Sequence, residues 1–185
     1  MARVRSIPAA ELPADLAAIY EAFAGYGPFR NQVAVLAHVP AALRHLMPLL
    51  IELRAAQTLP KRALELAIVT VSQLNACQYC VAHHTPFLAV EGVSPAGAAR
   101  ILDYRDHPEL DDTDRLVVEY AIAAWDHPNR LPEALFSRLR RTFTEAQIVE
   151  LTLRITLCGF FNKFNDALAI EDEEEAAVAL AAVAG

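Results

Sequence analysis

The sequence lacks the features that mark proteins that bind nucleic acids. Its 185 residues carry 16 Lys and Arg against 23 Asp and Glu, so the formal net charge is -7 and the sequence pI is about 5.3. Phosphate binding depends on clustered basic side chains. The one dense basic cluster, Arg138, Arg140 and Arg141, is typical of the solvated face of a helix. We therefore expect no nucleic-acid partner.

Long apolar runs and cysteines are also scarce. No apolar run reaches the roughly 20 residues of a membrane span without an interrupting charge or helix breaker. The first residues, Met-Ala-Arg-Val-Arg-Ser, lack the apolar segment of a secretory signal. Three cysteines are too few for a disulfide framework. These absences predict a cytoplasmic protein with no membrane partner. In that reducing compartment, a close pair of cysteines is expected to be redox-active or to bind a metal.

Apolar residues, in contrast, make up 55% of the chain, and most recur with the period of an α-helix. The pattern predicts an all-α bundle of about eight or nine helices. Short connections favour a single domain over residues 1–185. So many apolar helix faces also predict a homo-oligomer. Helices are expected over 13–24, 31–38, 40–57, from Pro60, from Asn75 to Gly92, from Ser94, over 111–125 and 132–143, and from Thr144, which forms a capping box with Gln147.

Four residues carry the chemistry of this chain. Cys77 and Cys80 are three residues apart near the predicted start of a helix, and His84 follows Cys80 by one helical turn. Glu65, on the preceding helix, is placed to orient the imidazole. Positive potential at a helix N-terminus favours a thiolate. The set therefore predicts a nucleophilic cysteine with a base and a carboxylate that orients the base.

Two effects disagree on which cysteine attacks. The potential of the helix N-terminus is strongest at Cys77, whereas His84 lies closer to Cys80. We assign Cys80, because an adjacent base both removes the proton and pairs with the charge. Of the neighbouring residues, Cys158 is expected to serve packing, His83 to lie at the surface or an interface, and the acidic run 171–175 to form a solvated helix end.

The spacing E-x11-C-x2-C-x3-H over Glu65, Cys77, Cys80 and His84 resembles the carboxymuconolactone decarboxylase superfamily, in particular its alkylhydroperoxidase D-like (AhpD-like) branch. The segments 31–40, 59–65, 91–93 and 143–169 also resemble that family. Tyr79 stands where a better-known member has a histidine before its second cysteine.

The resemblance implies an AhpD-like helical subunit that forms a trimer or hexamer. It also implies an oxidoreductase without a cofactor, a thiol peroxidase of antioxidant type. In its cycle one cysteine reduces a small hydroperoxide and becomes a sulfenic acid, the other forms a disulfide with it, and an external dithiol or protein reductant reopens that disulfide.

Three other readings stay open. A cofactor-free decarboxylase acting on a lactone acid belongs to the same superfamily, although that branch works without the cysteine pair. A metal site built from Cys77, Cys80 and His84 lacks a second ligand pair, since the chain has no further Cys-x2-Cys or His-x3-His. A non-catalytic oligomeric module would use the apolar content only to build subunit interfaces.

Overall fold

The computed structural model describes residues 2–173, and over these residues the chain is helical, without a strand. The prediction of an all-α fold is confirmed. Within this range the α-helices are α1 (Ala14–Phe23), α2 (Arg30–Leu36), α3 (Pro40–Ala56), α4 (Lys61–Leu74), α5 (Gln78–Val90), α6 (Pro95–Ala99), α7 (Asp112–Asp126), α8 (Glu133–Thr142) and α9 (Glu145–Leu168), and the 3-10 helices are η1 (Ala9–Glu11), η2 (Ile101–Asp106) and η3 (Pro128–Arg130).

The helix ends follow local chemistry. The Thr144 side chain accepts a hydrogen bond from the Gln147 backbone, and the Gln147 side chain returns one to Thr144, so the predicted capping box starts α9. The Ser94 side chain caps α6, with Pro95 in its first turn. The start of α5 differs from the prediction: Asn75 is the C-cap of α4, and Cys77 is the N-cap of α5.

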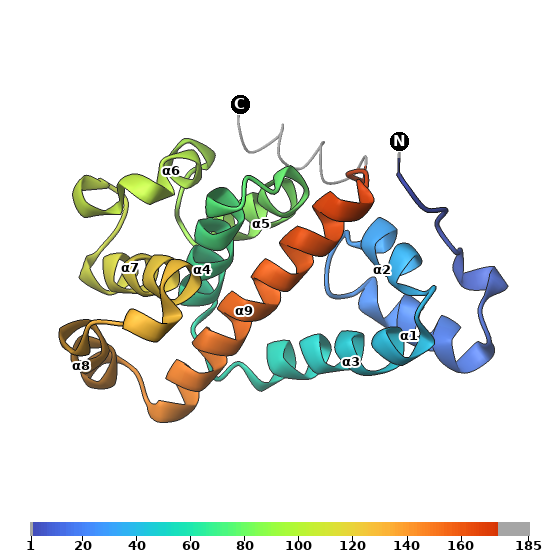
Figure 1. The fold of residues 1–185 in the computed structure, drawn as a ribbon, viewed down its shortest axis with the longest axis horizontal. Helices are drawn as coiled ribbons and strands as arrows, with labels where there is room; N and C mark the ends of the chain where they lie inside the picture. Colours follow the sequence, from blue (N-terminus) through green and yellow to red (C-terminus); the bar gives the residue numbers. More distant parts are fainter. Residues whose placement is uncertain (1, 174–185) are drawn as a thin grey trace.

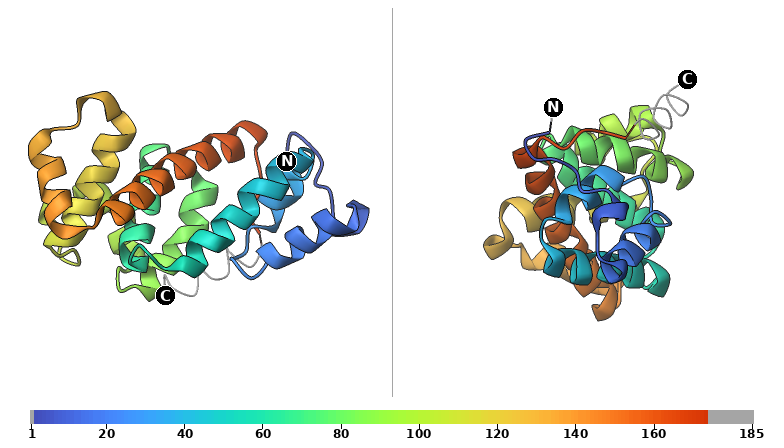
Figure 2. Two further views of the ribbon diagram at one scale, coloured as in Figure 1. Left: turned by 90° about the horizontal axis from the view of Figure 1, so that it is seen from below. Right: turned by 90° about the vertical axis from the view of Figure 1, so that its right-hand side faces the viewer.

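The two helices that carry most of the packing are α4 and α9. In Figure 1, α9 runs diagonally across the molecule, with α6, α7 and α8 on one side and α1, α2 and α3 on the other. Helix α4 packs against α5, α7 and α9. The views in Figure 2 show α1 and α3 lying together at one end of the molecule, where the two helices pack against each other.

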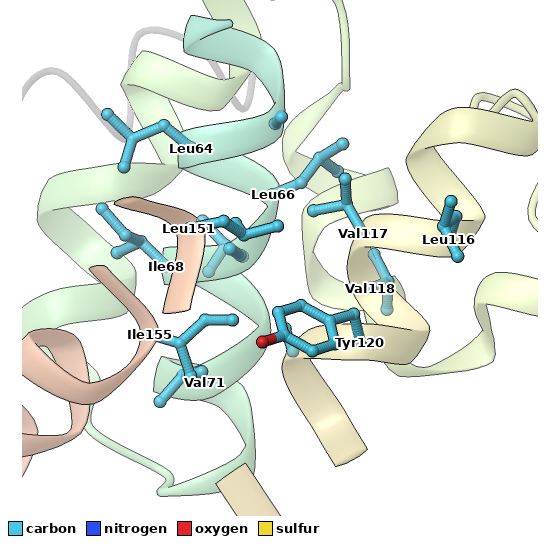
Figure 3. Close-up of a cluster of buried hydrophobic side chains, with 14 of the residues drawn as sticks. Leu64, Leu66, Ile68, Val71, Leu116, Val117, Val118, Tyr120, Leu151 and Ile155 are labelled. Atoms are coloured by element: carbon cyan, nitrogen blue, oxygen red, sulfur yellow. The ribbon is translucent and has the colours of Figure 1, made fainter. Parts of the chain in front are cut away.

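The larger apolar core lies between α4, α7 and α9 (Figure 3). Buried residues follow one another around the whole circumference of α4, so other elements enclose this helix on all sides. Truncating one of its large side chains, such as Leu66, would cost about 2–5 kcal/mol. The labelled members of this core are Leu64, Leu66, Ile68 and Val71 of α4, Leu116, Val117, Val118 and Tyr120 of α7, and Leu151 and Ile155 of α9.

A second apolar core joins α1, α2 and α3 to the first turn of α5. It contains Cys77, Tyr79 and Cys80 together with Phe161 of α9. The cysteine pair therefore lies where the N-terminal helices meet α5 and α9. Because the pair belongs to a packed core, its geometry depends on helices far away in the sequence.

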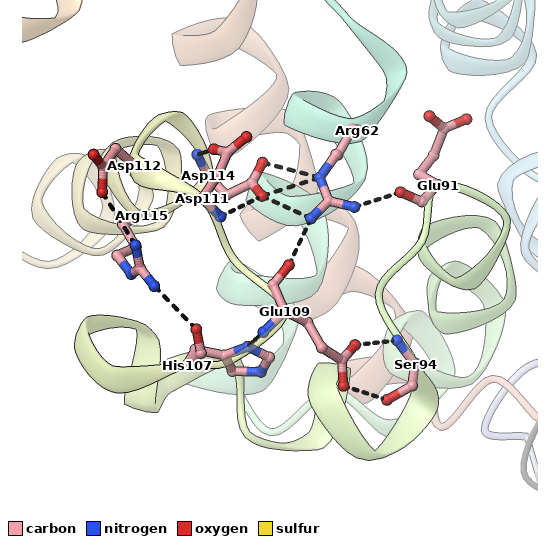
Figure 4. A network of polar contacts seen from close by, with 9 residues as sticks. All are labelled: Arg62, Glu91, Ser94, His107, Glu109, Asp111, Asp112, Asp114 and Arg115. Carbon is pink, nitrogen blue, oxygen red and sulfur yellow. Dashed lines mark hydrogen bonds and ion pairs between the residues drawn. The ribbon is translucent and has the colours of Figure 1, made fainter.

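A half-buried arginine ties the start of α4 to two loops (Figure 4). Arg62 donates to both carboxylate oxygens of Asp114 at the start of α7, and its other nitrogens donate to the backbone carbonyls of Glu91 and Glu109. A guanidinium is planar and carries several N–H donors, so it can donate to several acceptors at once. The network holds α4, from which Glu65 comes, at a set position relative to the end of α5.

Two sequence predictions about surfaces can be compared with the structure. The cluster of Arg138, Arg140 and Arg141 is exposed on α8, as predicted, and two of these side chains pair with Glu119 and Glu133. Within residues 2–173, no helix has the length and apolar character that crossing a membrane would require.

Candidate active site

The turn between α4 and α5 places the first cysteine outside the helix. Ala76 has a φ of 53°, in the left-handed region, which ends α4 and reverses the chain. The backbone amide of Cys77 then donates to the carbonyl of Ser72, at 3.0 Å. Asn75 does not cap α5, because its side chain is already bonded to Asn162 and Trp125. Cys77 is thus the N-cap residue, and Cys80 lies in the first turn.

The two sulfurs have different surroundings. Cys77 is 0% exposed and Cys80 is 5% exposed, and both are unpaired. The hydrogen bond of the Cys77 thiol to Cys80 raises the pKa of Cys77, and burial raises it further. Of these two cysteines, Cys80 lines the adjoining cavity and Cys77 does not. Cys77 therefore stays a thiol behind Cys80, and Cys80 faces the space a reactant could occupy.

His84 and Glu65 are brought together as predicted. Nδ1 of His84 lies 2.8 Å from Oε2 of Glu65, and both side chains are largely buried. A carboxylate only accepts, so the Nδ1 proton points to Glu65, and Nε2 is left as the basic nitrogen. His84 lines the same cavity as Cys80, one helical turn away.

The cavity beside Cys80 is small and mainly apolar. It encloses about 50 Å³ and has aromatic walls from Phe23, Tyr26, Phe29 and Phe161. A second cavity of about 140 Å³ shares Tyr26, His84 and Arg154 with it. The two cavities therefore adjoin each other at these residues. Arg154 is buried and pairs with Glu150, one turn earlier on α9.

His83 is not at the surface, which corrects the prediction made for it. Its ring is 1% exposed, stacks on Tyr79 and Phe29, and contacts Oε2 of Glu173 through Nε2. Nδ1 of His83 lies 2.6 Å from the carbonyl of Tyr79, so Nδ1 carries a proton. Nε2 of His83 then faces the carboxylate of Glu173.

Glu173 also corrects the prediction of a solvated helix end over 171–175. Helix α9 ends at Leu168, and Ala169 adopts a left-handed conformation. Glu173 then turns inward and accepts hydrogen bonds from the hydroxyl of Tyr79 and the backbone amide of Asn31. Residues 174 and 175 lie outside the described range. The partners of Glu173 are 90 or more positions away, so no local pattern could have indicated this cluster.

Cys158 lies in the larger core, in agreement with the packing role predicted for it. Burial raises its pKa to about 12. A thiol with that pKa remains protonated at neutral pH and reacts slowly. In the described part of the chain, no group of three or more His, Cys, Asp or Glu side chains is arranged to hold a metal ion.

Comparison with known proteins gives matches in sequence and in fold. Residues 40–106, which include all four predicted site residues, match the carboxymuconolactone decarboxylase family. The uncharacterized protein YnjA of Escherichia coli (strain K12) is 32% identical over 100 residues, or 54% of this chain and 55% of YnjA. The match thus spans about half the length of that curated relative.

Two solved structures share the fold. An uncharacterized peroxidase-related protein from Ralstonia eutropha JMP134, with an alkylhydroperoxidase AhpD core, is 22% identical with a TM-score of 0.79, covering 95% of this chain and 94% of its own. The debrominase Bmp8 is 19% identical with a TM-score of 0.73, covering 93% of this chain and 95% of its own. Residues 40–106 are thus similar to the carboxymuconolactone decarboxylase family, and the chain shares its fold with AhpD-like proteins.

Proposed function

We propose that this protein is a thiol-dependent peroxidase that uses Cys80 as the nucleophile and Cys77 as the resolving cysteine. One observation carries the proposal: Cys80 faces a cavity beside a histidine oriented by a carboxylate, while Cys77 is buried directly behind it. This is the arrangement that nucleophilic catalysis by cysteine needs.

The proposed cycle has three steps. The Cys80 thiolate attacks one oxygen of a hydroperoxide, the O–O bond breaks, and the leaving alkoxide takes a proton to become an alcohol. Cys80 is then a sulfenic acid, which the Cys77 thiol attacks, forming a disulfide and releasing water. An external dithiol supplies two electrons and two protons to reopen the disulfide and is itself oxidised. His84 removes the proton from Cys80 before the first step.

Replacing each cysteine in turn tests this assignment. We expect Cys80→Ser to abolish peroxide consumption in a single turnover. Cys77→Ser should consume one equivalent and leave a sulfenic acid that a dimedone probe traps, because no second thiol resolves it. Mass spectrometry after peroxide, with and without added dithiol, should show the Cys77–Cys80 bond form and reopen. A Cys80→Ser protein that reacts at the full rate would overturn the assignment.

Reductive dehalogenation is a second candidate, favoured by the aromatic walls of the cavity next to Cys80. The debrominase with the same fold has been crystallised as a cysteine-to-alanine variant with 2,3,4-tribromopyrrole. In such a reaction a carbon–bromine bond is replaced by a carbon–hydrogen bond, bromide leaves, and the two thiols become a disulfide. Bromide release from 2,3,4-tribromopyrrole, measured beside consumption of cumene hydroperoxide, separates the two candidates.

Decarboxylation of a lactone acid is the third reading, and the cysteine variants also address it. The decarboxylase branch does not use a cysteine pair, so that activity would survive both Cys80→Ser and Cys77→Ser. If the dithiol carries the chemistry, Cys80→Ser should lose all activity and Cys77→Ser should stop after one equivalent of substrate.

A further inference from the structure

A buried amide from α9 contacts the sulfur of Cys80. Nδ2 of Asn165 lies 3.4 Å from Sγ of Cys80, and Asn165 is 1% exposed. Gln32 of α2 donates from Nε2 to Oδ1 of Asn165, at 3.0 Å. In Figure 1, the C-terminal end of α9 lies between α5 and α2. The two hydrogen bonds of Asn165 therefore link α9 to both of these helices.

The contact has a fixed direction. Gln32 presents an amide nitrogen, which only donates, so the oxygen of Asn165 faces Gln32. The nitrogen of Asn165 must then face the sulfur, and an amide nitrogen again only donates. A thiolate is an acceptor, so this arrangement suits the charged sulfur better than the neutral thiol. Gln32 and Asn165 are both buried, so solvent water does not compete for the hydrogen bond between them.

We propose that Asn165, held in place by Gln32, is a catalytic hydrogen-bond donor that stabilises the Cys80 thiolate and selects Cys80 over Cys77 as the nucleophile. This inference rests on the proposed function for its catalytic meaning. A charged sulfur in an apolar core is costly unless a donor meets it. The Cys77 thiol donates toward Cys80, whereas the backbone amide of Cys80 donates toward Cys77, so each sulfur faces one donor from the motif itself. The amide of Asn165 adds a donor to Cys80 from outside the motif, and Cys80 is also the less buried of the two.

Other charged and titratable groups also surround the pair and would influence the ionisation of either sulfur. Apart from the two cysteines they come from the turn after α1, from α4, α5 and α9, and from the segment after α9. These groups are Tyr26, Glu65, Tyr79, His83, His84, Arg154, Cys158, Asp166 and Glu173. A test must therefore change the amide without changing any of them.

Alkylation of Cys80 by iodoacetamide, mapped by mass spectrometry across pH 6–10, provides a readout that needs no peroxide. Asn165→Leu removes the donor at nearly constant size, and we expect the alkylation rate at pH 7 to fall about 10- to 100-fold, the effect of one hydrogen bond to a charged group. The rate should recover toward the wild-type value at high pH, where ionisation no longer limits it. Asn165→Asp should lower the rate at least as much, because a carboxylate repels the thiolate.

Asn162→Leu is the matched control. Asn162 lies one turn earlier on the same helix and is equally buried, but its side chain bonds to Asn75 and Ser72 and not to Cys80. Its replacement perturbs the packing of α9 without touching the reactive sulfur. Circular dichroism and thermal melts establish that each variant is folded. Rescue by Asn165→Gln is not expected, because the longer side chain cannot keep both contacts.

The outcomes separate this inference from the proposed function. If Asn165→Leu lowers Cys80 alkylation and Asn162→Leu does not, the donor role holds, even if the wild-type protein consumes no peroxide. If Asn165→Leu is folded and alkylates at the wild-type rate across the pH range, the inference is wrong, even if the protein is an active peroxidase. Equal losses in both variants would also overturn it, because they would indicate general packing.

Discussion

At the scale of the residue, the two cysteines of one motif differ in burial and in access to the cavity, and so they suit different chemical roles. Cys77 is enclosed and its pKa is raised, whereas Cys80 lines the cavity. His84 lies on the same side as Cys80 and is oriented by Glu65. This asymmetry arises from burial and hydrogen bonding, because the two thiols are chemically identical in the unfolded chain.

The pairing of His84 with Glu65 leads to a prediction for both residues. His84→Asn removes the base, and we expect the rate constant for reaction with hydroperoxide to fall about 100-fold or more. Glu65→Gln keeps the shape but weakens the orientation and basicity of the imidazole, so a loss of about 10-fold is expected. Stopped-flow measurement of sulfenic acid formation checks both.

His45→Asn serves as a control for these variants, because His45 is exposed on α3. It should react like the wild type. A His84→Asn protein with an unchanged rate would show that the imidazole does not take the proton from Cys80.

At the scale of the element, the segment after α9 is held against α5 by Glu173. This carboxylate meets His83 and Tyr79 on α5 and the backbone of α2. Tyr79 therefore points its hydroxyl at Glu173, and its pKa is raised by burial and by that carboxylate. His83 of this cluster stacks on Phe29, which also lines the cavity beside Cys80.

Replacement of Glu173 should destabilise the protein in a graded way. Glu173→Ala leaves Tyr79 and His83 buried without a partner, and we expect the free energy of unfolding to fall by about 3 kcal/mol. Glu173→Gln should recover most of this loss, because its oxygen accepts from Tyr79 and its amide donates to Nε2 of a neutral His83. Urea denaturation provides the measurement.

Asp172→Ala is the control for that series, since Asp172 is exposed beside Glu173. It should unfold at nearly the wild-type urea concentration. Equal stability of Glu173→Ala and Asp172→Ala would mean that the buried cluster adds nothing to the fold.

At the scale of the whole molecule, buried thiols and phenols make stability depend on alkaline pH. The pKa of Cys158 rises from 9.0 to about 12 on folding, and the pKa values of Cys77, Tyr26 and Tyr79 are raised as well. A group whose pKa is raised in the folded state stabilises the fold fully below its unfolded pKa. That contribution is lost as the pH rises toward the folded pKa.

We therefore expect the free energy of unfolding to fall above about pH 9, by about 1 kcal/mol per pH unit for each such group. Urea denaturation at pH 7.5, 9, 10 and 10.5 gives the slope.

Cys158→Ala should be less stable at every pH because of the cavity it creates. Its slope between pH 9 and 10.5 should nevertheless be shallower, since one titrating group is gone. Identical slopes would contradict the role given to Cys158.

The exposed apolar residues of α9 bear on assembly, for which we propose the trimer or hexamer that the family resemblance implies. Val149, Leu153 and Phe160 are all more than a third exposed and follow one stripe of the helix. Val149→Glu combined with Phe160→Glu should lower the mass measured by light scattering to that of one chain. Leu102→Glu, at an exposed apolar residue of η2, should leave the mass unchanged. A monomeric wild-type protein would refute the proposal.

The sequence by itself determined what depends on neighbours along the chain. Helix periodicity, the Thr144 capping box and the proline starts predicted the helices, and the i to i+4 spacing placed His84 one turn from Cys80. The start of α5 was misplaced at Asn75, because the left-handed conformation of Ala76 has no signal in an alanine.

Only the tertiary structure decided which groups surround each sulfur. Asn165 reaches Cys80 from 85 positions away, Gln32 reaches Asn165 from 133, and Glu173 reaches His83 from 90. Such contacts arise because α2, α5 and α9 pack into one core, and packing energies depend on all the elements together. The same packing buries Cys77 and leaves Cys80 at the cavity, so the fold adds a difference in access to the spacing that led the motif alone to Cys80 as the proposed nucleophile.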